Sequence, residues 1–108
     1  MNTLDMVISS VIKWGISKGI LAKDPINNPD NQVKQTLKMV AEVGELADEI
    51  AKENYDKAKM ELGDVLVTTI LLADLLDATI EECLHLAYEK ISKRTGKTVN
   101  GVFIKDET

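Results

Sequence analysis

The 108-residue sequence has few aromatic residues, only one cysteine and only two prolines. A single cysteine, Cys83, excludes an internal disulfide and agrees with a reducing, cytoplasmic environment. Because prolines and glycines are scarce and β-branched residues do not alternate in long runs, the composition favours long helices over sheets. The length is that of a single domain, which we expect to span residues 1–108.

The sequence also lacks an excess of basic residues and any long apolar run. Its net charge of −5 argues against a surface for a nucleic-acid polymer or an anionic membrane, and is compatible with metal binding. The most apolar segment, 65–76, is about half as long as the ~20 residues of a membrane span. The N-terminus has neither the basic start nor the cleavage site of a signal peptide. These absences predict a soluble, cytoplasmic protein.

Hydrophobic periodicity predicts four helices, at about residues 4–18, 30–53, 57–76 and 80–94, followed by a tail over 95–108. The second helix carries an apolar face that we expect to be buried. Its members are Val33, Leu37, Val40, Gly44, Ala47 and Ala51. Gly44 costs about 0.8–1 kcal/mol of helix propensity relative to alanine, so a close approach by another helix or a ligand is expected there. Apolar residues lie on nearly all sides of the third helix, which indicates that a partner subunit buries part of its surface.

Two local signals organise the C-terminal part of the chain. Thr79-Ile80-Glu81-Glu82 is a capping box that should begin the fourth helix. The inward residues of that helix are expected to be Ile80, Leu84, Ala87 and Ile91. Asn100-Gly101 between apolar residues predicts a tight hairpin turn. Because an isolated hairpin is only marginally stable, we expect it to pack against the helices or against a neighbouring molecule. The fold class is therefore all-α: a four-helix-bundle-like domain with a short tail or hairpin, assembled as a homo-oligomer.

Two pairs of carboxylates stand out on the second and third helices. Glu42 and Glu45 share a helix face, and Glu61 and Asp64 repeat the same spacing. If the two helices form an antiparallel hairpin through residues 54–56, the pairs lie at similar heights and converge. Converging carboxylates repel one another, so a cation must offset them or some must hold protons. An all-oxygen ligand set suits Mg²⁺ or Mn²⁺, with Ca²⁺ possible, rather than Zn²⁺.

The spacing alone leaves two other interpretations open. Glutamates three residues apart are common on solvated helix faces, where Lys38 and Lys52 would be ordinary salt-bridge partners. Asp64 fits that interpretation less well, because it lies on a mostly apolar helix. Glu82 and His85 have the Glu-x-x-His spacing of di-iron carboxylate bundles, but such proteins need two of these motifs and the chain has one.

The segment from Gln35 to Ala47, followed by Glu61-Leu-Gly-Asp-Val-Leu, resembles the all-α nucleoside triphosphate pyrophosphohydrolases of the MazG type. Their mark is Glu-Glu-x-x-Glu followed by Glu-x-x-Asp on the next helix, and the tail from Lys93 to Phe103 is also similar to the end of small MazG-like proteins. The resemblance implies that Mg²⁺ is bound by Glu42, Glu45, Glu61 and Asp64. Ala41 departs from the pattern, since the family usually has the first glutamate of its triplet there.

The same resemblance implies a hydrolase that converts a nucleoside or deoxynucleoside triphosphate into a monophosphate and pyrophosphate. Glu42 or Glu45 would also act as the general base. Candidate substrate contacts are Lys38, Thr68, Lys93, Arg94, Lys97 and Asn100. Expected partners are the triphosphate and further copies of the chain, as a dimer or tetramer.

Several of these residues also have an interpretation that involves no substrate. Lys38 could simply pair with Glu42, Thr68 could bond its own helix backbone, and the basic tail is typical of a solvated helix end. Trp14 is expected in the core, with stacking on a base as the alternative. Because of Ala41, a catalytically weak or inactive nucleotide-binding module remains the alternative function.

Overall fold

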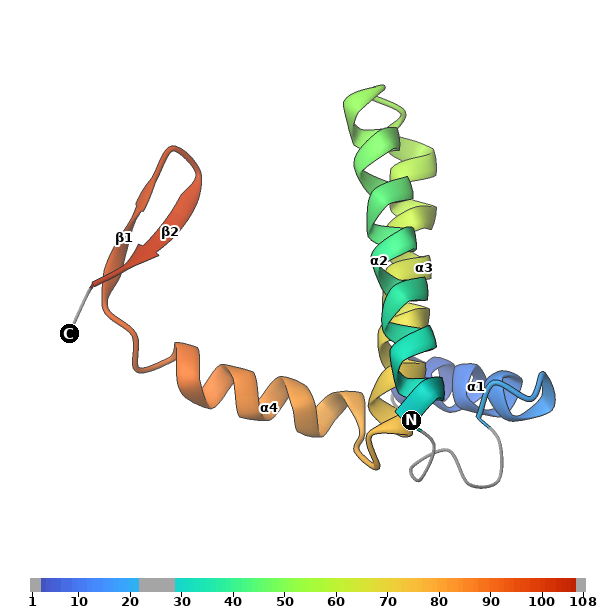
Figure 1. The fold of residues 1–108 in the computed structure, drawn as a ribbon. Helices are drawn as coiled ribbons and strands as arrows, with labels where there is room; N and C mark the ends of the chain where they lie inside the picture. Colours follow the sequence, from blue (N-terminus) through green and yellow to red (C-terminus); the bar gives the residue numbers. More distant parts are fainter. Residues whose placement is uncertain (1–2, 22–28, 107–108) are drawn as a thin grey trace.

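The computed structural model describes residues 3–21 and 29–106, so the last two residues of the predicted tail lie outside it. Four helices and a hairpin occupy these residues, and the predicted helices are confirmed with small shifts at their ends (Figure 1). Their bounds are α1 Thr3–Ser17, α2 Pro29–Ala51, α3 Tyr55–Leu75, α4 Ile80–Ile91, β1 Gly96–Val99 and β2 Val102–Lys105. None of the helices in the described ranges is long and apolar enough to cross a membrane.

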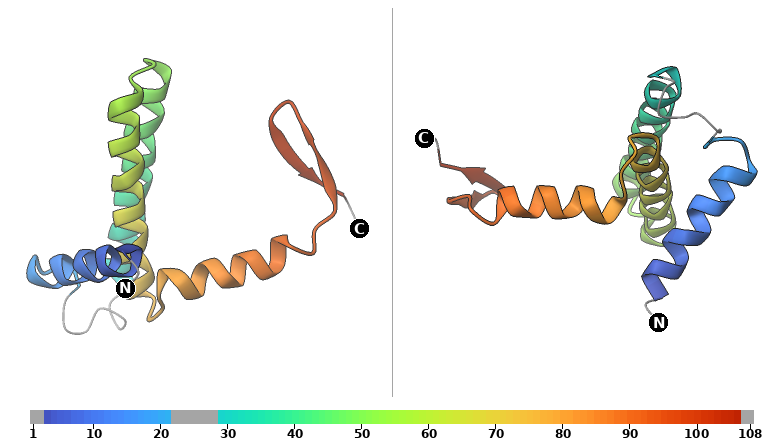
Figure 2. Two further views of the ribbon diagram at one scale, coloured as in Figure 1. Left: turned by 180° about the vertical axis from the view of Figure 1, so that it is seen from behind. Right: turned by 90° about the horizontal axis from the view of Figure 1, so that it is seen from below.

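Helices α2 and α3 form the long antiparallel pair at the centre of the structure. Helix α1 crosses the lower end of this pair and α4 leaves the same end toward another side, as the views from behind and below show (Figure 2). Beyond α4, the chain turns and the hairpin runs roughly alongside α2 and α3 without contacting them (Figure 1). The elements therefore form an open, bent structure and not a closed four-helix bundle.

The buried core is small and lies where α1 crosses α3. Leu21, Leu71 and Leu75 form it, and the partly buried residues around it come from α1, the segment after α1, and α3. Gly15 allows this crossing, because a Cβ atom there would lie 2.6 Å from Cδ2 of Leu71. The core thus fixes α1 against α3 at one end and leaves most of the α2–α3 pair uncovered.

The apolar face predicted for α2 is present, but its expected burial is wrong within this chain. Val33, Leu37 and Val40 are 58, 62 and 59% exposed, and no described atom approaches within 4 Å of a Cβ built on Gly44. The face of α2 that packs toward α3 instead carries the buried residues Gln35 and Glu42. Periodicity identified the apolar side of the helix, but not which neighbour covers it.

Helix α4 also differs from the expectation of an inward-facing stripe. It contains no buried residue, and Leu84 is 68% exposed. Helix α4 is exposed because it extends away from the α2–α3 pair and contacts only α3 among the described elements. The predicted burial of this helix is therefore wrong for the single chain.

The local signals at the start of α4 and in the tail are confirmed. The Thr79 hydroxyl accepts a hydrogen bond from the Glu82 amide at 3.0 Å, as an N-terminal cap should. Asn100 and Gly101 adopt φ values of 51° and 81°, which the two-residue type I′ turn requires. This turn pairs Val99 with Val102 and sets the register of the hairpin.

Candidate metal centre

Three carboxylates converge between the two long helices. Glu42 and Glu45 come from α2 and Glu61 comes from α3, and one carboxylate oxygen of each lies within 4.8 Å of the others. The antiparallel pairing of α2 and α3 through a short connection brings residues equally far from the turn to the same height. The convergence predicted from spacing is therefore present for three of the four carboxylates.

Two of these carboxylates have an oxygen that is buried without a hydrogen-bond partner. They are Oε2 of Glu42 and Oε2 of Glu61. Glu42 as a residue is 7% exposed, and its other oxygen accepts a hydrogen bond from Lys38 Nζ at 3.0 Å. A buried carboxylate oxygen without a donor is costly, so a group of them favours an added cation. The donor chemistry fits a hard divalent ion such as Mg²⁺ or Mn²⁺.

The pKa values of Glu42 and Glu45 are shifted in opposite directions. A side-chain hydrogen bond with Glu42, followed by charge repulsion from Glu42 and Glu61, raises the pKa of Glu45. The hydrogen bond from Lys38 lowers the pKa of Glu42, and the same contact raises the pKa of Lys38. The charged form of Glu42 is therefore favoured and the charged form of Glu45 is disfavoured. A divalent cation among the three carboxylates would offset the repulsion that disfavours it.

Asp64 lies one turn beyond Glu61 but outside the group of three. It is exposed, and it borders two adjoining pockets of about 230 and 370 Å³. Its charge is among the weaker contributions to the raised pKa of Lys38, after the hydrogen bond and charge of Glu42. Asp64 and Glu42 thus both border the smaller pocket.

The two pockets share an aromatic and apolar wall. Trp14 and Val67 line both, and Lys38, Glu42 and Thr68 line the smaller one. Trp14 is 47% exposed, so its expected place in the core is wrong, and its exposure allows a ligand to contact it. A polar edge of carboxylates beside an apolar wall is the usual composition of a small-molecule site.

Thr68 and Gln35 belong to the buried layer behind the smaller pocket. The Thr68 hydroxyl donates to the carbonyl of Val65 at 2.8 Å, and Gln35 Nε2 donates to the carbonyl of Thr68 at 3.3 Å. The hydroxyl proton of Thr68 is therefore engaged within its own helix, although its oxygen still borders the pocket. Gln35 was missed by the sequence reasoning, and its spacing of seven residues from Glu42 is the signal that marks it.

The sequence predicts that Glu49 extends the face of Glu42 and Glu45 by one turn. It follows Glu42 by seven residues, and its Oε2 is also buried without a hydrogen-bond partner. It lies outside the group of three converging carboxylates. It extends the negative charge of the α2–α3 interface toward the connection.

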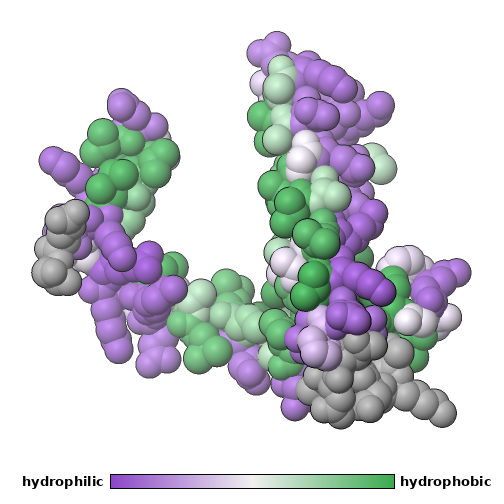
Figure 3. All heavy atoms as spheres, viewed as in Figure 1, coloured by the Kyte–Doolittle hydropathy of each residue, from purple (hydrophilic) through white to green (hydrophobic). Residues whose placement is uncertain are grey.

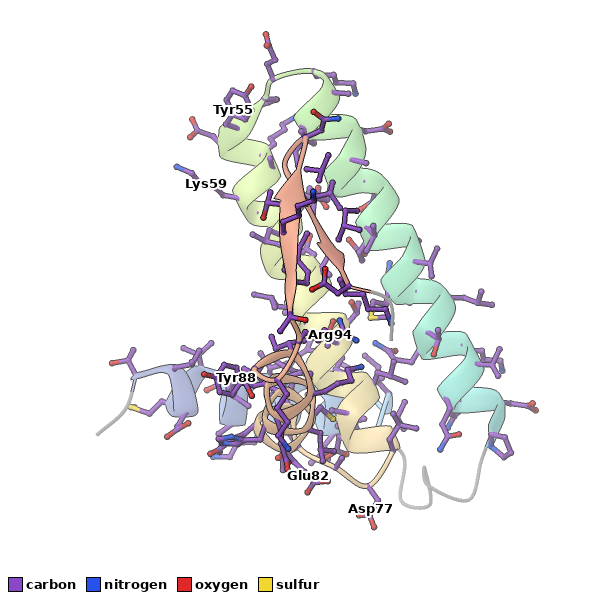
Figure 4. All side chains as sticks on the ribbon, turned by 90° about the vertical axis from the view of Figure 1, so that its left-hand side faces the viewer. Tyr55, Lys59, Asp77, Glu82, Tyr88 and Arg94 are labelled. Atoms are coloured by element: carbon purple, nitrogen blue, oxygen red, sulfur yellow. The ribbon has the colours of Figure 1, made fainter. Side chains whose placement is uncertain are left out.

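The structure does not bring the basic tail residues to the carboxylates of the same chain. Lys93, Arg94, Lys97 and Asn100 are exposed, and Arg94 lies at the junction of α4 and the hairpin (Figure 4). Among the described elements, the hairpin contacts neither α2 nor α3. Any role of these residues at the carboxylates of this chain would need a large movement of α4.

The residues of the di-iron alternative are also remote from the acidic group. Glu82 and His85 are exposed on α4, and His85 Nε2 lies 3.7 Å from Oε1 of Glu81 on the same helix. Cys83 is a free, partly buried cysteine. The short contact of His85 is therefore with Glu81, four residues away, and not with the Glu82 of the Glu-x-x-His spacing.

The fold and the site together define a class of protein. It is a helical protein in which a group of carboxylates, able to hold a divalent cation, lies beside a pocket. The family model of the MazG nucleotide pyrophosphohydrolase domain matches residues 32–99, and the chain belongs to this family. The match runs from α2 into the hairpin and contains all four carboxylates of the predicted site. No curated protein and no solved structure matches the chain at a significant level.

Replacing Glu45 with glutamine should stabilise the metal-free protein at neutral pH and remove its stabilisation by Mg²⁺. The pKa of Glu45 is raised in the folded state, so its favourable contribution is present below the unfolded pKa and is lost as the pH rises through the folded pKa. Thermal melts with chelator should therefore show a higher Tm for Glu45→Gln than for wild type at neutral pH, and a smaller difference in mild acid.

With Mg²⁺ at tenfold its Kd, the wild type should gain about 1.4 kcal/mol, or roughly 6–11 °C in Tm. Asp48→Asn, an exposed carboxylate on the same helix, is the matched control and should keep this gain. An equal gain in Glu45→Gln and wild type would show that Mg²⁺ binds elsewhere.

Proposed function

We propose that this chain is a Mg²⁺-dependent pyrophosphohydrolase that converts a nucleoside or deoxynucleoside triphosphate into a monophosphate and pyrophosphate. The observation that carries the proposal is the group of three converging carboxylates, with buried oxygens that lack partners, beside a pocket with an aromatic wall. Membership of the MazG nucleotide pyrophosphohydrolase family supports the same reaction. Mn²⁺ would serve as an alternative ion.

In this proposal Glu42, Glu45 and Glu61 hold the ion, and Asp64 completes the set from the pocket side. When bound, the ion supplies charge neutralisation for the phosphates and lowers the pKa of a water molecule. Glu42 remains ionised because Lys38 holds its pKa down. Glu42 or Glu45 would act as the general base through a water molecule.

The pockets give the substrate its orientation. Trp14 is partly exposed and would offer its ring to a base, and the smaller of its two pockets is also lined by Glu42 and Asp64. Lys38 adds one positive charge at the edge of the smaller pocket, and Thr68 adds a hydroxyl oxygen. In this proposal the base lies against α1 and the phosphates lie between α2 and α3.

A second candidate function follows from Ala41. The side chain next to Glu42 is a methyl group where the family pattern has a carboxylate. A protein that lacks that carboxylate could bind the nucleotide and its ion without efficient turnover. Calorimetry with a triphosphate that binds but is not cleaved would support this alternative.

A panel of ribo- and deoxynucleoside triphosphates with Mg²⁺ should yield monophosphate and pyrophosphate from at least one member. Glu61→Gln should lower the rate by about 100-fold or more, since even residues that only support metal ligands are worth 10–100-fold. Glu53→Gln, an exposed glutamate in the connection between α2 and α3, should leave the rate unchanged. Products separated by ion-exchange chromatography check this, and a rate shared by wild type and Glu61→Gln would refute the enzymatic proposal.

Trp14 is the only tryptophan, so its fluorescence should report the base directly. Adding a cleavable triphosphate should change the emission of the wild type. Trp14→Ala should raise KM by about 5- to 150-fold with little change in kcat, because stacking on a base contributes about 1–3 kcal/mol. Trp14→Phe keeps an aromatic face and should recover most of the loss. Unchanged KM in Trp14→Ala would place the base elsewhere.

A further inference from the structure

Among the described residues of α2, one uncharged polar side chain is buried against α3, that of Gln35. The residue is 8% exposed and lies on the side of α2 opposite the exposed apolar face of Val33, Leu37 and Val40. That apolar face is visible along the edge of the α2–α3 pair that looks toward the hairpin (Figure 3). A buried amide is costly unless its hydrogen-bonding groups are used, and a leucine would fill the same place without that cost. Gln35 therefore needs a reason other than packing.

Gln35 is one of two glutamines of α2 that bond to the backbone of α3. Gln35 Nε2 donates to the carbonyl oxygen of Thr68 at 3.3 Å, and Gln32 Nε2 donates to that of Leu75 at 3.0 Å. Of the two, Gln35 lines the pocket of about 230 Å³ that also contains Trp14, whereas Gln32 does not. A tie between the helices is enough to explain Gln32. The amide of Gln35 has in addition a place beside a ligand.

The hydrogen bond to Thr68 determines which groups of Gln35 are left for a ligand. Because Nε2 faces the Thr68 carbonyl, turning the amide over would bring Oε1 against another acceptor. Oε1 is therefore left as an acceptor, and the second hydrogen of Nε2 is left as a donor. The Thr68 hydroxyl donates its only hydrogen to the Val65 carbonyl at 2.8 Å, so its oxygen can only accept. Gln35 and Thr68 thus offer two acceptors and one donor to the pocket that both line.

Polar residues follow one another along both helices, from the end that α1 crosses toward the connection of α2 and α3. In that order they are Gln35, Lys38 and Glu42 on α2, and Thr68, Asp64 and Glu61 on α3. Gln35 and Glu42 are seven residues apart, which is about 10.5 Å at 1.5 Å per residue. In the proposed function the ion and the phosphates take the carboxylate end. The base then takes the end with Gln35 and Thr68.

We propose that Gln35 and Thr68 recognise the base and select one that carries an exocyclic amino group beside an unprotonated ring nitrogen, as in cytosine and adenine. Such an edge supplies two N–H donors and one acceptor, which match the two acceptors and the one donor of the site. Uracil and hypoxanthine have an oxo group beside a protonated ring nitrogen, so they supply one donor and leave one acceptor of the site without a partner. The inference rests on the proposed function, which places the phosphates at the carboxylate end.

The first test compares triphosphates that differ only at this edge of the base. Cytidine is paired with uridine triphosphate, and adenosine with inosine triphosphate, each with Mg²⁺. In the pair that is cleaved faster, kcat/KM for the amino member should exceed that for the oxo member by about 5- to 150-fold, because a bidentate pair of hydrogen bonds discriminates by that factor. The faster pair also shows whether the pocket takes a pyrimidine or a purine. Equal values within that pair, or a higher value for the oxo member, would overturn the inference.

Replacing Gln35 with leucine should bring this ratio of kcat/KM values close to unity. Gln32→Leu loses the same kind of bond between α2 and α3 outside the pocket, so it is the matched control and should keep the wild-type ratio. A purely structural role of Gln35 predicts that both values fall by the same factor and that the ratio stays as in wild type. That result would overturn the assignment of Gln35.

The second acceptor is tested by Thr68→Val, which should also lower the ratio and which decides the case if Gln35→Leu loses its helical circular dichroism. Thr69 donates to the same Val65 carbonyl at 2.7 Å but does not line the pocket, so Thr69→Val is the matched control and should keep the ratio. Thr68→Ser retains the hydroxyl and should keep it as well. A wild-type ratio in Thr68→Val would overturn the assignment of two acceptors.

A binding measurement separates this inference from the proposed reaction. Analogues of the same four triphosphates with a methylene group between the α and β phosphorus atoms bind without being cleaved at that position. Calorimetry with Mg²⁺ should give a Kd about 5- to 150-fold lower for an amino analogue than for its oxo counterpart, and Gln35→Leu should remove the difference.

The two proposals then fail in different ways. If the natural triphosphates are not cleaved but the amino analogues bind more tightly, the proposed reaction is wrong and the selection of the base stands. If the triphosphates are cleaved but neither kcat/KM nor Kd distinguishes amino from oxo, the selection of the base is wrong and the reaction stands. An absence of binding by all four analogues would also overturn the selection of the base.

Discussion

The repulsion among Glu42, Glu45 and Glu61 is the interaction on which the rest of this structure depends. Three carboxylates from two helices lie within 4.8 Å of one another, and two of them have an oxygen buried without a donor. Lys38 offsets part of the charge at Glu42, and the remaining repulsion raises the pKa of Glu45. The antiparallel α2–α3 pair holds these groups together at a cost that a divalent cation would remove.

The position of these carboxylates between α2 and α3 explains the unusual distribution of polar and apolar residues on α2. A helix normally turns its apolar stripe toward its own chain and its charged residues toward solvent. Here the side of α2 that packs against α3 carries Gln35 and Glu42, while Val33, Leu37 and Val40 point outward. An acidic site inside the pair and an apolar face outside it belong together, since a chain that uses its interior for chemistry must cover its apolar surface elsewhere.

The elements of the fold follow from local signals that need no knowledge of neighbours. The helical periods, the Thr79 cap and the Asn100-Gly101 turn each depend on a few consecutive residues, and all are confirmed. The approach of Glu42, Glu45 and Glu61 also follows from spacing, because a short connection brings residues equally far from the turn to similar heights, whereas Asp64 lies outside the group that the same spacing predicted.

The packing could not be predicted in the same way. Periodicity shows that α2 and α4 each have an apolar side, but it does not say whether that side meets the same chain, and in both helices it does not. Trp14 looked like a core residue because it lies on an apolar stripe, yet α1 contacts only α3 among the described elements and leaves the ring exposed. Gln35 and Glu49 share the face of Glu42 by their seven-residue spacing, but the burial of Gln35 and of the Glu49 Oε2 atom depends on the α2–α3 contact.

The central claim is that the carboxylates between α2 and α3 hold a divalent cation. Electron paramagnetic resonance of Mn²⁺ measures this directly, because free Mn²⁺ gives a sharp six-line signal that weakens when the ion is bound. Wild type added to Mn²⁺ should reduce the signal, excess Mg²⁺ should restore it, and Glu61→Gln should reduce it far less. A signal that wild type and Glu61→Gln reduce equally, or that neither reduces, would contradict the account.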